Sequence, residues 1–231
     1  MSVSIGVPGV GSTRSAGYRE ILVSQTGLML LPAGKIIDGS KSRDPLNTGY
    51  VDVLRCGLLL GKITASGKYA PSVLGVSTVA YTSGAVSLTV SAATATELVR
   101  RIGESGSAKL IGPPSASGTV ATLTVTYSAV NTTTGVITVS DLGANAVAGS
   151  LLVPADGSED PLCLFGQPEG LKVTDPDGTS LNVELARGIV GGQIDASQII
   201  NYPSDSSLKA WVKAQLRENG VGFTFDDDFS N

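Results

Sequence analysis

The sequence predicts a mainly β protein with one C-terminal helix and a small α+β insertion. Short runs of alternating apolar and polar residues recur along the chain, separated by turn sequences at a spacing of about ten residues, which is typical of barrels and sandwiches. Glycine supplies 29 of the 231 residues, as expected of a chain with many turns. Hydrophobic residues make up 42%, enough to bury a substantial core in a chain of this length.

The first 56 residues are expected to form an N-terminal arm and the first strands. Val3, Ile5 and Val7 alternate with small residues, which is a strand pattern, but the flanking glycines leave this strand without a local core. Such a segment is either a disordered terminus or an arm that pairs with a sheet edge on another chain. We expect the arm to contact its partner through Val3, Ile5, Val7, Val10, Tyr18 and Ile21.

Two stretches, 57–79 and 149–231, are predicted to form the β-rich body. Residues 57–63 read as an apolar strand, followed by a tight turn and a second short strand. Turn sequences at 155–157 and 176–178 then separate several further short strands. This regular succession favours a barrel or sandwich for the body.

Residues 80–148 have a different character and are predicted to be an inserted subdomain of the order β-α-β-β-β. Thr94 and Glu97 have the spacing of a capping box, which predicts that a short helix starts there. Residues 119–127 and 135–140 flank a turn sequence and predict a hairpin.

The C-terminal part changes to a helical period. Leu208, Trp211 and Leu216 lie on one face of the predicted helix, which Ser204 or Asp205 can cap at its start. A short strand follows the helix. The residues predicted to form core or a subunit interface are Leu208, Trp211, Leu216, Phe223 and Phe225. For the single Trp211, packing in the core is the first expectation and an interface anchor the second.

The residue types needed for common catalytic sites are absent or widely separated. The chain has no histidine, which removes the usual general base, the Ser-His-Asp triad and histidine metal ligands. Cys56 and Cys163 each lie in an apolar run, so two buried reduced thiols are favoured over a disulfide. We therefore expect no enzymatic activity, no catalytic residue, no cofactor and no metal site.

Three motifs resemble binding sites but fail on detail. Residues 57–63 have the wrong glycine spacing for a phosphate loop, and Ile63 stands where a Ser or Thr belongs. Residues 175–178 begin like a calcium loop, yet Ala186 occupies the position of its final glutamate, so a turn is favoured. The acidic groups at 156–160 and 226–228 are read as solvated, the latter alternatively as docked on a basic patch of a neighbouring chain.

Charge and hydropathy exclude two classes of partner. The net charge is −4 and no basic stripe is present, so we expect no nucleic-acid binding. No apolar run approaches the length of a membrane span, and the N-terminus lacks the pattern of a secretory signal, so we expect synthesis in a cytoplasm and no membrane. Charged residues make up only 16%, and such a neutral surface suits burial in a large assembly.

Two stretches, GLLLGKITASGKYAPS at 57–72 and LKAWVKAQLRENGVGFTF at 208–225, resemble the head-decoration (capsid cement) proteins of tailed phages, of the lambda type. The segment at 148–161 fits that family more loosely. The resemblance implies a body of barrel or β-tulip type and a homotrimer on the exterior of the virion. It also implies an arm that orders on the expanded capsid, with the major capsid protein as partner. The insertion at 80–148 departs from the family pattern.

Two other functions remain open from the residues. One is another virion β protein, such as a tail-tube, fibre or adhesin module, in which the insertion binds a receptor or a sugar. The other is a trimeric β enzyme with an acid-based site between subunits.

Overall fold

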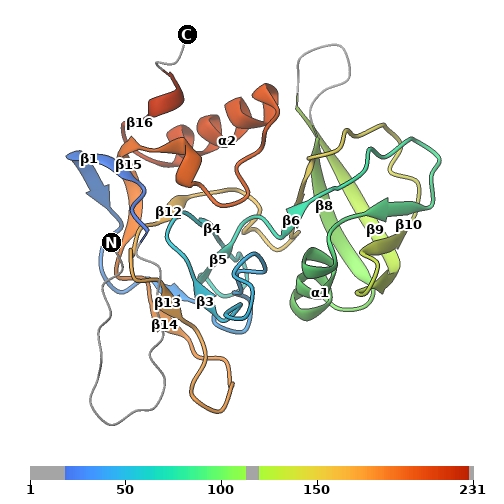
Figure 1. Ribbon diagram of the computed structural model, residues 1–231, viewed down its shortest axis with the longest axis horizontal. Coiled ribbons are helices and arrows are strands. Elements are labelled where there is room, and N and C mark those ends of the chain that lie inside the picture. The colour runs from blue at the N-terminus through green and yellow to red at the C-terminus, as the bar shows by residue number, and fades with distance from the viewer. Residues whose placement is uncertain (1–18, 113–119, 229–231) are drawn as a thin grey trace.

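The computed structural model describes residues 19–112 and 120–228. It is mainly β, with 36% of residues in strands and 15% in helices, which confirms the predicted fold class. Figure 1 shows two lobes side by side, each built on one curled sheet and one α-helix. We call the lobe that carries the C-terminal helix the body, and the lobe formed by residues 75–153 the small lobe.

The body is built on an eight-stranded sheet that is mainly antiparallel. Its strand order is β1-β15-β12-β4-β5-β2-β14, and β16 pairs with β15 in parallel. The strands are β1 (Leu22–Leu30), β2 (Ile36–Ile37), β4 (Leu59–Lys62), β5 (Tyr69–Pro71), β12 (Cys163–Phe165), β14 (Val183–Glu184), β15 (Gly188–Ile194) and β16 (Phe223–Phe225). A separate pair, β3 (Val53–Leu54) and β13 (Leu171–Lys172), forms a two-stranded antiparallel sheet of its own. Two short 3-10 helices, Ala196–Gln198 and Asp226–Asp228, complete the body.

Helix α2 (Ser206–Asn219) covers the body core, and local signals set both of its ends. The Asp205 carboxylate accepts hydrogen bonds from the backbone N–H groups of Ser207 and Leu208, which confirms one of the two predicted caps. Gly220 ends the helix. Its buried face consists of Leu208, Val212 and Leu216, which are fully enclosed in the body core.

The small lobe has the predicted succession of elements, since β7 (Ser87–Thr89), α1 (Ala92–Arg101), β8 (Gly106–Gly112), β9 (Ala121–Asn131) and β10 (Val136–Val139) follow in that order. The four strands among them form one six-stranded sheet with β6 (Gly75–Val76) and β11 (Leu151–Val153), in the order β6-β11-β8-β9-β10-β7. The predicted hairpin is β9 and β10, which pair antiparallel. The sheet therefore recruits strands from both sides of the 80–148 insertion.

The predicted start of α1 is wrong by about one turn. Ser91, not Thr94, is the N-cap, and its hydroxyl accepts a hydrogen bond from the Thr94 N–H. Ser91 has extended backbone angles and lies three residues before Thr94, so it captures the first free amides of the helix. Thr94 is buried instead against Gly75, where a side chain on the glycine would have no room.

Strand β11 forms the wall between two hydrophobic cores. Leu151 and Val153 pack in the body core, whereas Leu152 between them packs in the core of the small lobe. Successive side chains of a strand point to opposite faces, so one strand serves both cores. Leu110 and Ile111 of β8 divide between the two cores in the same way.

The two cysteines are free thiols in different parts of the body interior. Cys56 packs in the core beneath α2, and Cys163 lies in a second core cluster around Phe165. Burial raises the pKa of the Cys56 thiol to about 11, and it raises the pKa of Cys163 as well. Both side chains are fully enclosed, as the predicted reduced thiols require.

Candidate interaction surface

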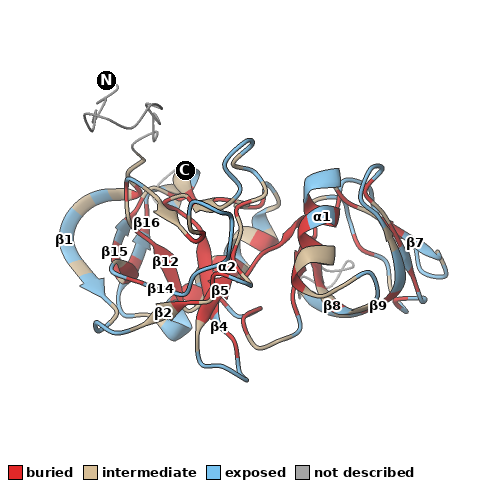
Figure 2. Ribbon diagram, turned by 90° about the horizontal axis from the view of Figure 1, so that it is seen from below, coloured by how far each residue is buried: buried red, intermediate tan, exposed pale blue. Residues whose placement is uncertain are grey.

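Strand β1 is the terminal strand of the body sheet. In the described part of the chain it pairs only with β15, so its outer edge has backbone N–H and C=O groups without a strand partner. Figure 2 shows β1 bent around the rim of the body, mostly exposed, while β4, β5 and β12 are buried. Such an edge can accept an additional strand from another chain.

The side chains along this edge are uncharged, and three large apolar ones are exposed among the polar Ser24, Gln25 and Thr26. Val23 is 59% exposed, Met29 46% and Leu30 44%, and β1 contains no charged residue. Val221, 58% exposed, lies close by, because its backbone and the Met29 side chain both flank Gly191 of β15. Edge strands of soluble proteins are usually protected by charges or proline, and β1 has neither.

A bulge interrupts the edge. Leu22 pairs with Ile194 and Ser24 with Gln193, but the next pair is Met29 with Gly191. The extra residues of β1 include Gly27, which has a positive φ of 74°. The bulge divides the edge into two short stretches, so it favours a short partner strand over open-ended strand addition.

Of the predicted arm residues, the structure describes only Ile21. Val3, Ile5, Val7, Val10 and Tyr18 lie outside the described residues. Ile21 is not an arm residue, because its side chain is fully buried in the body core and its carbonyl accepts from the Asp195 N–H. Arg19 donates to the carbonyls of Pro168 and Gln198, so the chain is already anchored to the body at this point.

The predicted core or interface set belongs to the core of its own chain. Leu208 and Leu216 of α2 are fully enclosed, and Phe223 and Phe225 of β16 stack beneath the helix with ring centroids 6.1 Å apart. Trp211 is only partly buried and packs against the same core. The first expectation for this residue, packing in the core, is the one that its contacts favour.

The acidic segment 226–228 docks on the helix of its own chain. Lys213 lies 2.7 Å from carboxylate oxygens of both Asp227 and Asp228, and Arg217 also pairs with Asp228. Asp226 accepts from the Ala196 N–H. The basic patch that these acids contact is therefore on α2, which corrects the expectation of a free tail or a neighbouring chain.

A second exposed apolar surface lies on loops beside β3 and β13. This surface is formed by residues 46–51 and by residue 181. Backbone hydrogen bonds connect the two loops, because the Val173 N–H donates to the Asp52 carbonyl and the Leu181 N–H donates to the Val173 carbonyl. Sequence analysis missed this surface because its apolar residues follow neither a strand nor a helical period. The feature of the sequence that could have indicated this surface is a group of large apolar residues within or beside loops, namely Leu46, Tyr50, Val51 and Leu181.

The motifs that resemble binding sites serve the fold. Gly57 donates to Phe165 and accepts from Ile200, so its backbone is engaged in the sheet and does not cradle a phosphate. Asp175 closes a turn by accepting from the Gly178 and Thr179 N–H groups. Across residues 19–112 and 120–228, no group of three or more Cys, Asp or Glu side chains is placed to hold a metal ion.

The helices of the described residues lack the length and apolar character of a membrane span. Comparison of the chain with protein-family models, with curated proteins and with solved structures finds no match.

Proposed function

We propose that this protein is a non-catalytic virion protein that binds the outer surface of the expanded phage capsid and stabilises it by bridging major capsid subunits. One observation carries the proposal. The two stretches that resemble decoration proteins are far apart in the sequence, yet they fold into one unit. Residues 57–72 form β4 and β5, and residues 208–225 form α2 and β16, all on or against the body sheet.

The edge of β1 supplies a means of attachment. A strand added to this edge would form main-chain hydrogen bonds with β1 and cover Val23 and Met29. Main-chain bonds provide affinity, and the alternate side chains provide specificity. Because residues 1–18 lead directly to this region, arm and edge together would contact a capsid subunit at adjacent points.

Selective binding to the expanded shell would stabilise it. A ligand that prefers one of two lattice states shifts the equilibrium towards that state by mass action. In the trimer that the resemblance implies, three copies of each contact would act together, and this multivalency would raise the avidity well above that of a single contact.

The proposal is tested by sedimenting the purified protein with undecorated expanded capsids and with procapsids. We expect the protein to pellet with expanded capsids only. Protein that stays in the supernatant with expanded capsids contradicts the proposal. A version without residues 1–17 tests the arm separately, and equal binding by that version would exclude the arm but not the capsid role.

Two matched variants test the β1 edge. Val23→Asp places a charge on the edge, and Val86→Asp places the same charge on the small lobe, where Val86 is 70% exposed. Both should change the free energy of unfolding by no more than about 0.5 kcal/mol, because the sites are exposed. We expect only Val23→Asp to weaken capsid binding. Equal binding by both variants would remove the edge from the mechanism.

A second candidate function is that of a receptor-binding or glycan-binding virion module. Its candidate surface is a shallow, open depression along the β9–β10 hairpin, lined mainly by small hydroxyl and aliphatic side chains, namely Ala129, Val130, Asn131, Thr132, Thr134, Val136 and Thr138. Binding of host-surface glycans to the isolated protein, lost in Thr132→Tyr, would favour this function. A tail-tube protein would instead polymerise, which electron microscopy detects.

A further inference from the structure

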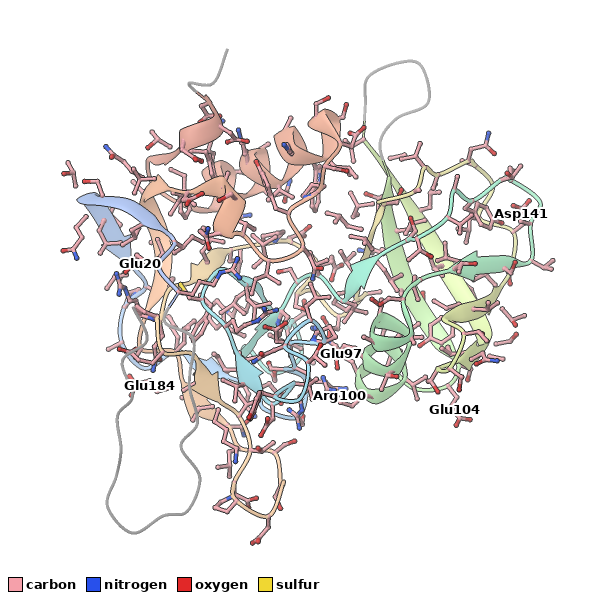
Figure 3. The ribbon with its side chains drawn as sticks, viewed as in Figure 1. Glu20, Glu97, Arg100, Glu104, Asp141 and Glu184 are labelled. Atoms are coloured by element: carbon pink, nitrogen blue, oxygen red, sulfur yellow. The ribbon has the colours of Figure 1, made fainter. Side chains whose placement is uncertain are left out.

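Arg101 is the last residue of α1, and its side chain is fully buried between the lobes. The guanidinium donates to the carbonyl of Pro71 and to the hydroxyl of Ser158, and it lies 3.4 Å from the Asp156 carboxylate. Figure 3 shows the neighbouring Glu97 and Arg100 on the side of α1 that faces the body. A charged group is thus enclosed at the junction of the two lobes.

The partners of Arg101 lie on both chain connections between the lobes. Pro71 ends β5 of the body, just before the chain enters the small lobe at β6. Asp156 and Ser158 follow β11, where the chain returns to the body. A hinge between the lobes would have to bend at these two connections. The one guanidinium ties both of them to α1.

Further contacts surround this point. The Lys41 ammonium of the body donates to the Arg101 carbonyl at 2.7 Å, and Arg100 donates to the Ser40 carbonyl. Lys109 of β8 pairs with Glu159 at 2.5 Å. Every one of these contacts joins the small lobe to the body, and Lys109 is the strand partner of Val153 in β11.

The hydrogen bonds and buried charge of Arg101 favour one orientation of the small lobe on the body. Hydrophobic contact across β11 holds the lobes together but is non-directional, whereas the hydrogen bonds of Arg101 require particular partners at particular angles. An unpaired buried charge is costly, and the two terminal nitrogens of Arg101 have partners although its buried Nε has none. Rotation of the small lobe would separate Arg101 from Pro71, Asp156 and Ser158 at once. We propose that Arg101 is a latch that holds the small lobe in one fixed orientation on the body.

The latch does not rest on the proposed capsid function, so purified protein is sufficient to test it. Spin labels at Thr132→Cys on the small lobe and Asp177→Cys on the body report the distance between the lobes, because both positions are exposed and the native cysteines are buried. We expect a single narrow distance distribution for the parent protein. In Arg101→Met, which keeps the length of the side chain but removes its charge and donors, the distribution should broaden or split.

Lys172→Met is the matched control, because Lys172 pairs with Asp52 within the body. It should leave the distribution narrow. Arg101→Lys keeps the charge but loses the fork of donors, so it should broaden the distribution less than Arg101→Met. If Arg101→Met fails to fold, Ser158→Ala and Asp156→Asn remove single partners and should broaden it in the same direction. A broad distribution in the parent, or folded Arg101 and partner variants as narrow as the parent, would overturn the latch.

Discussion

The two lobes each lay one helix against a curled sheet, but their helices use cationic side chains in opposite ways. Arg101 of α1 is fully enclosed and bonds to segments of the other lobe. On α2, Lys213 is 12% exposed and Arg217 45% exposed, and both pair with the segment 226–228. The first arrangement joins distant parts of the chain, and the second fastens a short C-terminal segment beside its own helix.

The difference shows how burial changes what an ion pair does. An exposed pair is screened by water and salt and contributes about 0–1 kcal/mol. A buried pair costs desolvation, so it adds little net stability, but removing one partner is strongly destabilising. The buried Arg101 therefore specifies the position of one lobe relative to the other. The more exposed Arg217 only helps to hold residues 226–228, whose position is already set by the preceding strand β16.

The largest expected effect tests whether the two lobes behave as separate folding units. Leu98→Ala in α1 and Leu208→Ala in α2 each empty a fully buried site and should cost about 2–5 kcal/mol in the free energy of unfolding. Because β11 serves both cores, we expect each variant to lower one common transition in urea, followed by circular dichroism and by Trp211 fluorescence. Two separate transitions in Leu98→Ala would show that the lobes unfold independently. Thr96→Ala, on the exposed side of α1, is the control.

An intermediate effect compares the two carboxylates. Asp156→Asn should cost about 1–3 kcal/mol, because it weakens a hydrogen bond to a charged and fully buried Arg101 that keeps its other partners. Asp228→Asn should cost no more than about 1 kcal/mol, because Arg217, one of its two cations, is 45% exposed. Chemical denaturation of both variants gives the comparison. An equal cost for the two substitutions would contradict the role assigned to burial.

The smallest effect is a pH dependence that separates the same two groups. Burial alone would raise the pKa of Asp156, but the Arg101 charge and hydrogen bonds from Ser158 hold it below its ordinary value of 3.8. Burial alone would also raise the pKa of Asp228, but the hydrogen bond and the charge of Lys213 outweigh burial, so the pKa of Asp228 is lowered as well. A carboxyl whose pKa falls on folding contributes stability above its unfolded pKa and loses it as the pH falls through the folded value.

Stability should therefore decline below about pH 4 in the parent, and each Asn variant should show a shallower decline. High salt should reduce the difference between the parent and Asp228→Asn more than that for Asp156→Asn, because Arg217 is 45% exposed whereas Arg101 is fully buried. Acid titration of thermal stability at two salt concentrations measures this. Equal salt sensitivity of the two differences would show that the Asp156 pair is as hydrated as the Asp228 pair.

Local signals predicted most elements, but they misplaced the start of α1 and the role of Ile21. Asp205 was expected at the start of α2 and caps it through two amides. Thr94 was expected to start α1, but Ser91 offers the same hydroxyl one turn earlier. Ile21 was assigned to the arm because it is apolar and near the N-terminus, and only its place under the sheet shows it to be core.

The sequence by itself determined the mainly β class, the β-α-β-β-β order of the insertion and the C-terminal helix, because periodicity, caps and turns act over a few neighbouring residues. Only the tertiary structure decided that β1 is an edge, that β11 separates two cores and that Arg101 is buried at their junction. The reason is physical. Arg101 meets partners 30, 55 and 57 residues away, and such a meeting depends on how the sheets pair, which no local pattern encodes.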